Sequence, residues 1–141
     1  MHCVTSVNNK TAPYAALTLR LTLGAMFLAH GLTKVFVFTL PGTAEFFTSL
    51  GIPGWIAYPI AMAEIGGGAL LILGVYSRWV AISLVPILLG ASLAHFRNGW
   101  SFSNPNGGWE YPVFLCIVAL VVMLLGDGAL ALRPSRIQRQ P

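Results

Sequence analysis

The sequence predicts an all-α membrane protein, a bundle of four transmembrane helices in up-down order with both termini in the cytoplasm. Two observations predict this class. Hydrophobic residues make up 56% of the 141 residues and charged residues only 9%, with a mean hydropathy of +0.75. A soluble globule of this length needs more charge to cover its surface. The apolar residues also gather in four runs, each near the length that crosses about 30 Å of hydrocarbon.

The runs divide the chain into three parts: a polar N-terminal tail over residues 1–13, a membrane domain over 14–132, and a basic C-terminal tail over 133–141 that is expected to fray. The expected spans are residues 14–40, 55–73, 79–96 and 110–128. Because neighbouring spans are joined by short connections, an up-down order is favoured.

The first span is expected to end at Pro41-Gly42, because proline cannot continue a helix. Residues 43–50 then form a short interfacial segment, and residues 51–54 a turn. The second span carries Glu64 near its middle and is separated from the third by a tight turn at 74–78.

The fourth span follows a polar loop over residues 97–109 and continues into Gly126-Asp127-Gly128, where Asp127 is interpreted as a cap or turn residue. Gly66-Gly67-Gly68 lies in the middle of the membrane. It therefore indicates a helix-packing surface rather than a phosphate-binding loop.

The basic residues predict the orientation of the bundle. One side of the membrane receives Lys10, Arg78, Arg133, Arg136 and Arg139, with Arg20 close by. The other side receives Lys34 and Arg97, so the positive-inside rule places both termini in the cytoplasm. Four tryptophans fall at span ends, as an aromatic belt requires: Trp55, Trp79, Trp100 and Trp109. This distribution indicates topology, and nucleic-acid binding is not expected.

The two cysteines, Cys3 and Cys116, are far apart in the chain. Cys3 lies in the tail and Cys116 inside an apolar run, where a packing role is expected. No Cys/His cluster has zinc spacing, so no metal site is predicted.

Ionisable residues within the spans are the candidate site. A charge in hydrocarbon costs several kcal/mol, so such residues usually face the bundle interior and have a partner. Counting from the span ends places His30 and Glu64 at similar depths of about 12–13 Å, where a hydrogen-bonded pair is expected. Five residues are expected to converge on the outer half of the bundle: His30, Lys34, Glu64, His95 and Glu110.

The sequence leaves alternatives open for most of these residues. His30 can instead bond a backbone carbonyl, and Lys34 and Glu110 are close enough to the interface to reach water. Arg20 and Arg78 can serve only to anchor the topology. A stripe on the first span places small residues between its charged ends and predicts close helix approach: Arg20, Gly24, Phe27, Gly31 and Lys34.

The order and spacing of these residues resemble the DoxX family over about residues 15–132. The resemblance is carried by Arg20-Leu21-x-Leu23-Gly24-x-x-Phe27-x-x-His30-Gly31-x-x-Lys34, Phe47-x-x-Leu50-Gly51-Ile52-Pro53, Ala63-Glu64-x-Gly66-Gly67, Leu73-Gly74, Arg78, His95, Gly107-Gly108-x-Glu110-Tyr111-Pro112 and Gly126-x-Gly128. The resemblance implies a four-helix, multi-pass protein of the bacterial inner membrane. Family members are linked to quinone chemistry, sulfur metabolism and oxidative-stress defence, often beside soluble enzymes.

Two functional hypotheses follow from the resemblance. The first is a quinone-linked oxidoreductase, or the membrane subunit of one, acting in sulfur or thiol redox or oxidative-stress metabolism. It implies catalytic roles for His30, Glu64 and Lys34, and quinone binding by His95, Glu110, Arg78 and Arg20. No covalently bound cofactor is expected. Electrons would come from a soluble redox partner protein or from a small reductant such as thiosulfate.

The second hypothesis is a non-enzymatic membrane scaffold or assembly partner, whose loop from Trp100 to Trp109 docks a soluble enzyme. Transport is a third reading and would require a homo-oligomer, because four helices leave little room for a path. Membrane lipid surrounds the bundle in every case.

Overall fold

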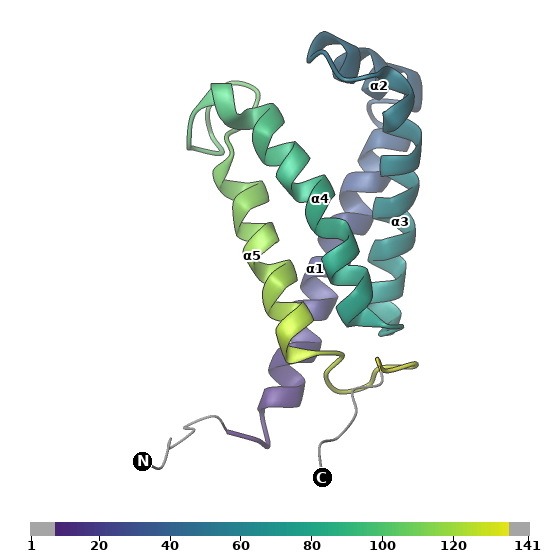
Figure 1. Ribbon diagram of the computed structural model, residues 1–141, viewed down its shortest axis with the longest axis vertical. Helices are drawn as coiled ribbons and strands as arrows, with labels where there is room; N and C mark the ends of the chain where they lie inside the picture. Colours follow the sequence, from purple (N-terminus) through teal and green to yellow (C-terminus); the bar gives the residue numbers. More distant parts are fainter. Residues whose placement is uncertain (1–7, 136–141) are drawn as a thin grey trace.

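A computed structural model describes residues 8–135 of the chain as helices joined by short turns and one longer loop. The helices are α1 (Ala12–Phe36), α2 (Leu40–Ser49), α3 (Ala57–Leu73), α4 (Ser77–His95) and α5 (Glu110–Leu125). Figure 1 shows α1 beside α3 and α4 beside α5. The two helix pairs lie close together at the end where the described chain begins and ends, and they spread apart at the end that carries α2.

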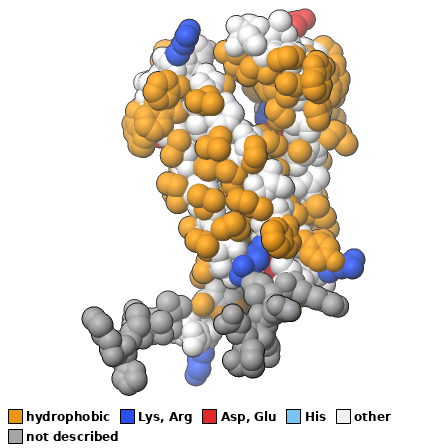
Figure 2. Space-filling model, in the orientation of Figure 1, with side chains coloured by type: hydrophobic (Ala, Val, Ile, Leu, Met, Phe, Trp, Pro, Cys, Tyr) orange, Lys and Arg blue, Asp and Glu red, His pale blue; other side chains and the backbone are white. Residues whose placement is uncertain are grey.

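Within residues 8–135, three helical segments are long and apolar enough to cross a membrane: Ala12–Phe36, Gly54–Leu73 and Ser77–Asn98. Hydrophobic side chains cover much of the surface between the two ends of the molecule (Figure 2). The protein is therefore a multi-pass membrane protein. α5 is apolar but has 16 residues, a length of about 24 Å. A fourth crossing by α5 and the cytoplasmic position of the termini stay predictions.

The prediction that Pro41 ends the first span is wrong. α1 ends at Phe36, and α2 begins at Leu40. Pro41 lies in the first turn of α2, where a missing N–H costs no helical hydrogen bond. Thr39, with φ of 62°, reverses the chain, and its hydroxyl accepts a hydrogen bond from the Gly42 amide at 3.2 Å.

Other boundaries also differ from the expectation. α5 ends at Leu125, before the expected residue 128, because Gly126 adopts a φ of 88° that helical geometry does not allow. α4 begins at Ser77, two residues before the expected start at Trp79.

The C-terminal segment does not fray where it leaves the bundle. The Arg133 amide donates to the Gly74 carbonyl oxygen at 3.0 Å, and the Arg133 carbonyl oxygen accepts from the Tyr76 amide at 2.9 Å. The Ala129 amide donates to the Pro13 carbonyl oxygen at 2.9 Å. Residues 129–133 therefore join the start of α1 to the turn between α3 and α4, whereas Arg136 and Arg139 lie outside the described residues.

The predicted small-residue stripe is confirmed as the contact between α1 and α3. A Cβ atom on Gly68 would lie 2.6 Å from the backbone nitrogen of Leu28, and one on Gly24 would lie 2.9 Å from the Gly68 carbonyl oxygen. A Cβ atom on Gly31 would lie 2.7 Å from the Ile65 side chain. Glycine at these positions therefore lets the two backbones touch.

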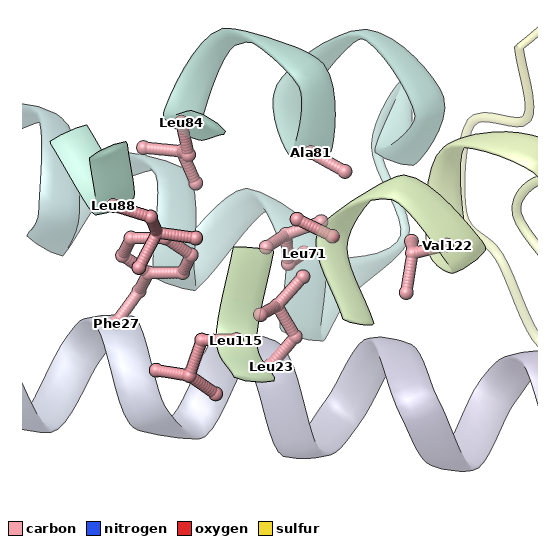
Figure 3. Close-up of a cluster of buried hydrophobic side chains, with 9 residues drawn as sticks. Leu23, Phe27, Leu71, Ala81, Leu84, Leu88, Leu115 and Val122 are labelled. Atoms are coloured by element: carbon pink, nitrogen blue, oxygen red, sulfur yellow. The ribbon is translucent and has the colours of Figure 1, made fainter. Parts of the chain in front are cut away.

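The apolar core joins the two helix pairs. Leu23 and Phe27 of α1, with Leu71 of α3, meet side chains of α4 and α5 that include Leu84, Leu88, Leu115 and Val122 (Figure 3). Cys116 is half-buried and packs against this core, as expected for a packing residue. Cys3 lies outside the described residues.

Candidate functional site

A cavity of about 900 Å³ lies between the two helix pairs, at the end where they spread apart. Figure 2 shows this end of the molecule hollowed between the pairs. Its floor includes the core residues Phe27, Leu88 and Leu115, and α2 contributes Phe46 and Phe47 to its wall. The lining is mostly apolar, with a few polar side chains: His30, Lys34, Glu64, His95 and Tyr111.

The strongest electrostatic contact in this cavity joins α1 to α3. The Lys34 ammonium lies 2.9 and 2.7 Å from the two carboxylate oxygens of Glu64. The Glu64 side chain is 6% exposed and the Lys34 side chain 19%. Gly31 permits this contact, because α1 passes close enough that a Cβ atom there would lie 3.1 Å from Glu64 Cβ. The expected hydrogen bond between His30 and Glu64 is therefore wrong, and Lys34 is the partner of Glu64.

His30 makes the backbone contact that the sequence left as its alternative. Its Nδ1 lies 2.8 Å from the carbonyl oxygen of Met26, one turn earlier on α1. Because a carbonyl only accepts hydrogen bonds, this contact assigns the ring proton to Nδ1, and the neutral ring keeps Nε2 as an acceptor. The imidazole is stacked on the Tyr111 ring, with centroids 5.7 Å apart and planes at 26°.

His95 and Glu110 hold the loop between α4 and α5. His95 Nδ1 lies 3.0 Å from the backbone carbonyl oxygen of Asn106 and 3.4 Å from the side-chain nitrogen Nδ2 of Asn98. The Glu110 carboxylate accepts a hydrogen bond from the Phe102 backbone amide at 2.6 Å. His95 lines the cavity and Glu110 does not, so the structure brings four of the five residues expected to converge to one cavity.

Arg20 and Arg78 lie at the opposite end of the bundle. Arg20 is fully buried, fourteen residues before Lys34 on α1, or about 21 Å along the helix. It donates to the carbonyl oxygens of Leu71 at 2.9 Å and Ile72 at 3.2 Å, in the last turn of α3. A third hydrogen bond, of 3.1 Å, reaches the Ala129 carbonyl oxygen. The positive charge of Arg20 therefore lies at the C-terminal end of α3, the negative end of that helix dipole.

Arg78 plays a similar part at the end of α5. Its guanidinium donates to the Leu124 carbonyl oxygen at 3.2 Å. A Cβ atom on Gly126 would lie 3.0 Å from Arg78 Nε, so glycine leaves room for this contact. Neither arginine lines the cavity.

Asp127 lies at the same end of the bundle as Arg20 and Arg78, which we call the closed end because the two helix pairs lie close together there (Figure 1). It is confirmed as a cap. One carboxylate oxygen accepts from the Ser77 amide at 2.7 Å, and the other accepts from the Ser135 amide at 2.7 Å. Ser77 is the first residue of α4, whose own flanking residue, Tyr76, offers no side-chain cap. A carboxylate at this position also complements the positive end of the helix dipole.

Sequence reasoning assigned no role to Tyr111, which lines the cavity beside His30. Two signals were available: its position in the first turn of an apolar helix, next to Glu110, and its place among the residues that carry the family resemblance. The contribution of α2 to the cavity wall was also missed. Among residues 8–135, no three His, Cys, Asp or Glu side chains are grouped closely enough to hold a metal ion.

Comparisons with known proteins agree with the resemblance seen in the sequence. The model of the DoxX family matches residues 15–97, which include most of α1 and all of α2, α3 and α4. The chain is also 32% identical over 126 residues to a protein of Bacillus subtilis (strain 168) named "Putative oxidoreductase CatD", an alignment that covers 89% of this chain and 90% of that protein. No solved structure matches. The chain belongs to the DoxX family of membrane proteins.

Proposed function

We propose that this protein is a quinone-linked oxidoreductase of the bacterial inner membrane, or the membrane subunit of one, and that a quinone binds in the cavity beside Lys34 and Glu64. One observation carries the proposal: a large apolar cavity between membrane helices has a buried ion pair and an imidazole in its wall. Its volume of about 900 Å³ is large enough for a drug-sized ligand.

The lining suits a ligand that is mostly apolar and carries a few oxygen atoms. A quinone has an apolar ring and side chain, and two carbonyl oxygens. The apolar walls from α2, α4 and α5 suit the ring and side chain. The polar side chains are few and come from α1, α3, α4 and α5, as in sites where a few placed polar groups fix the orientation of an apolar ligand.

Reduction of a quinone to a quinol takes up two electrons and two protons, and oxidation releases them. The residues of this chain would handle the protons. His30 Nε2 can take up a proton and pass it to a quinone oxygen as the quinone is reduced, and the ion pair of Lys34 and Glu64 lies in the same cavity wall. The electrons would come from a soluble redox partner protein or from a small reductant such as thiosulfate, and the quinone would take them up together with two protons. The name of the Bacillus subtilis relative supports redox chemistry.

One observation favours the scaffold as a second candidate. The loop between α4 and α5 exposes Trp100 and Phe102, whose side chains are 56% and 67% accessible. Trp100 packs edge-on against Trp109, with ring centroids 4.5 Å apart, so the loop has internal packing of its own. An exposed aromatic loop of this kind suits the docking of a soluble protein.

The experiment is a direct binding measurement on the full chain purified in detergent. Mass spectrometry would identify lipids and quinones that copurify, and titration with decylubiquinone would give a Kd. Lys34→Met is expected to raise the Kd at least tenfold, because it leaves the Glu64 charge unpaired in the cavity wall. Lys10→Met, which removes an exposed lysine before α1, is the matched control and should bind like the wild type.

Two outcomes would contradict the proposal. In the first, wild-type protein carries no quinone and binds no decylubiquinone. In the second, Lys34→Met binds with the wild-type Kd. Copurification of a stoichiometric soluble protein without any small ligand would support the scaffold instead.

A further inference from the structure

Tyr111 has a feature that the proposed proton chemistry does not use. Its ring lines the cavity, but its hydroxyl oxygen is buried and has no hydrogen-bond partner among the described residues. Buried hydroxyls are nearly always hydrogen-bonded, because an unpaired one loses its contacts with water without replacement. An orphaned donor beside a ligand-sized cavity therefore points to a group on the ligand.

The two aromatic neighbours of Tyr111 do not provide a hydrogen-bond partner for its hydroxyl. His30 presents the face of its ring to Tyr111, with the planes 26° apart, and its Nδ1 already contacts the Met26 carbonyl. On the loop side, the Phe102 ring has its centroid 6.2 Å away and offers no polar atom.

The other polar side chains of the cavity offer no free neutral donor to a carbonyl. His30 Nδ1 is directed at a backbone carbonyl oxygen, and so is His95 Nδ1 in its shorter contact, so each neutral ring keeps an acceptor at Nε2. The Glu64 carboxylate only accepts. Lys34 directs two of its three N–H groups to the carboxylate oxygens of Glu64, and it is a charged donor. A quinone carbonyl only accepts. Tyr111 is therefore the neutral donor that this lining offers to such a ligand.

We propose that the Tyr111 hydroxyl donates a hydrogen bond to a carbonyl oxygen of the bound quinone and thereby favours the oxidised head group. This inference rests on the proposed function. The hydroxyl is covered by protein, so the ligand oxygen reaches it by displacing a neighbouring side chain. Phe102 is the neighbour with the most freedom, because it sits on the loop and is 67% exposed.

The test compares Tyr111→Phe with the wild type, using full-length protein in detergent and decylubiquinone in its oxidised and reduced forms. Loss of one hydrogen bond should weaken binding of the oxidised form about five- to tenfold. The reduced form should be affected less, because its hydroxyls can donate to His30 Nε2. Without ligand, the variant should be as thermally stable as the wild type or more stable, since it loses an unpaired buried oxygen.

The stability measurement separates this role from a structural one. A Tyr111→Phe variant that is less stable without ligand would mean that the hydroxyl has a protein partner, and would overturn the inference. Unchanged affinity for the oxidised form would also overturn it. Tyr58→Phe on α3 is the matched control, because that side chain is 45% exposed and does not line the cavity. If wild-type protein binds neither form, the proposed function itself fails.

Discussion

The two ends of the bundle both bury charge among apolar helices, but they neutralise it differently. At the closed end, Arg20 and Asp127 bond mainly to backbone groups of other segments. At the open end, where the two helix pairs spread apart, Lys34 of α1 forms an ion pair with Glu64 of α3 beside a large cavity. The backbone groups at the closed end need these partners, because helix ends leave carbonyl and amide groups unpaired.

This difference separates structural charges from candidate functional ones. The Arg20 guanidinium is fully buried against three carbonyl oxygens and does not line the cavity, so a ligand there does not reach it. An ion pair in the wall of a cavity can exchange one partner for a ligand group. We therefore expect substitutions at the closed end to change stability and those at the open end to change ligand binding.

The largest effect is expected for Arg20→Met. The substitution leaves carbonyl oxygens of Leu71, Ile72 and Ala129 without this donor in a buried site, so the free energy of unfolding should fall by about 3 kcal/mol or more. Equilibrium unfolding in mixed detergent micelles would measure it, with Arg20→Lys as an intermediate case. The folded fraction should bind decylubiquinone with the wild-type Kd. Lost binding at unchanged stability would remove the distinction between the two ends.

Lys34→Met should come next, with a loss of about 2 kcal/mol, because it leaves Glu64 buried without its counterion. The double variant Lys34→Met/Glu64→Leu should recover most of this stability, since apolar side chains can replace a buried ion pair. It should still bind decylubiquinone at least tenfold more weakly than the wild type. A double-mutant cycle on stability and on Kd would show whether the two properties separate. Recovered binding in the double variant would mean that the ion pair is structural.

Asp127→Asn should cost about 1 kcal/mol, because the amide keeps the shape and one acceptor oxygen but loses the charge at the start of α4. Hydrogen exchange should rise locally at the Ser77 and Ser135 amides, which the carboxylate binds. Exchange that rises equally throughout α4 and α5 would instead indicate that Asp127 supports the whole bundle.

Glu110→Gln should have the smallest effect, about 0.5 kcal/mol or less. The glutamine oxygen can still accept from the Phe102 amide, so only the charge at the start of α5 is lost. Global stability should therefore stay close to that of the wild type. Limited proteolysis of the loop over residues 99–109 would detect any loosening. A large loss of stability would show that this loop contributes to the bundle, which would weaken the contrast between the two ends.

The sequence by itself determined that this is an apolar helical membrane protein and which ionisable residues lie within its helices. Long apolar runs and scarce charge require helices in lipid, because only internally bonded backbone is stable there. The small-residue stripe through Gly24 and Gly31 also identified the face of α1 that packs on α3.

Only the tertiary structure decided which partner each charge has. Counting along a helix gives the depth of a residue but not the direction in which its side chain points. His30 and Glu64 were therefore paired by depth, although Lys34, one turn away, makes the contact. Arg20 bonds to carbonyl groups that lie more than fifty residues away along the chain, and no local pattern signals such partners. The cavity itself arises from the spreading of two helix pairs, so the packing alone creates the space beside Lys34 and Glu64.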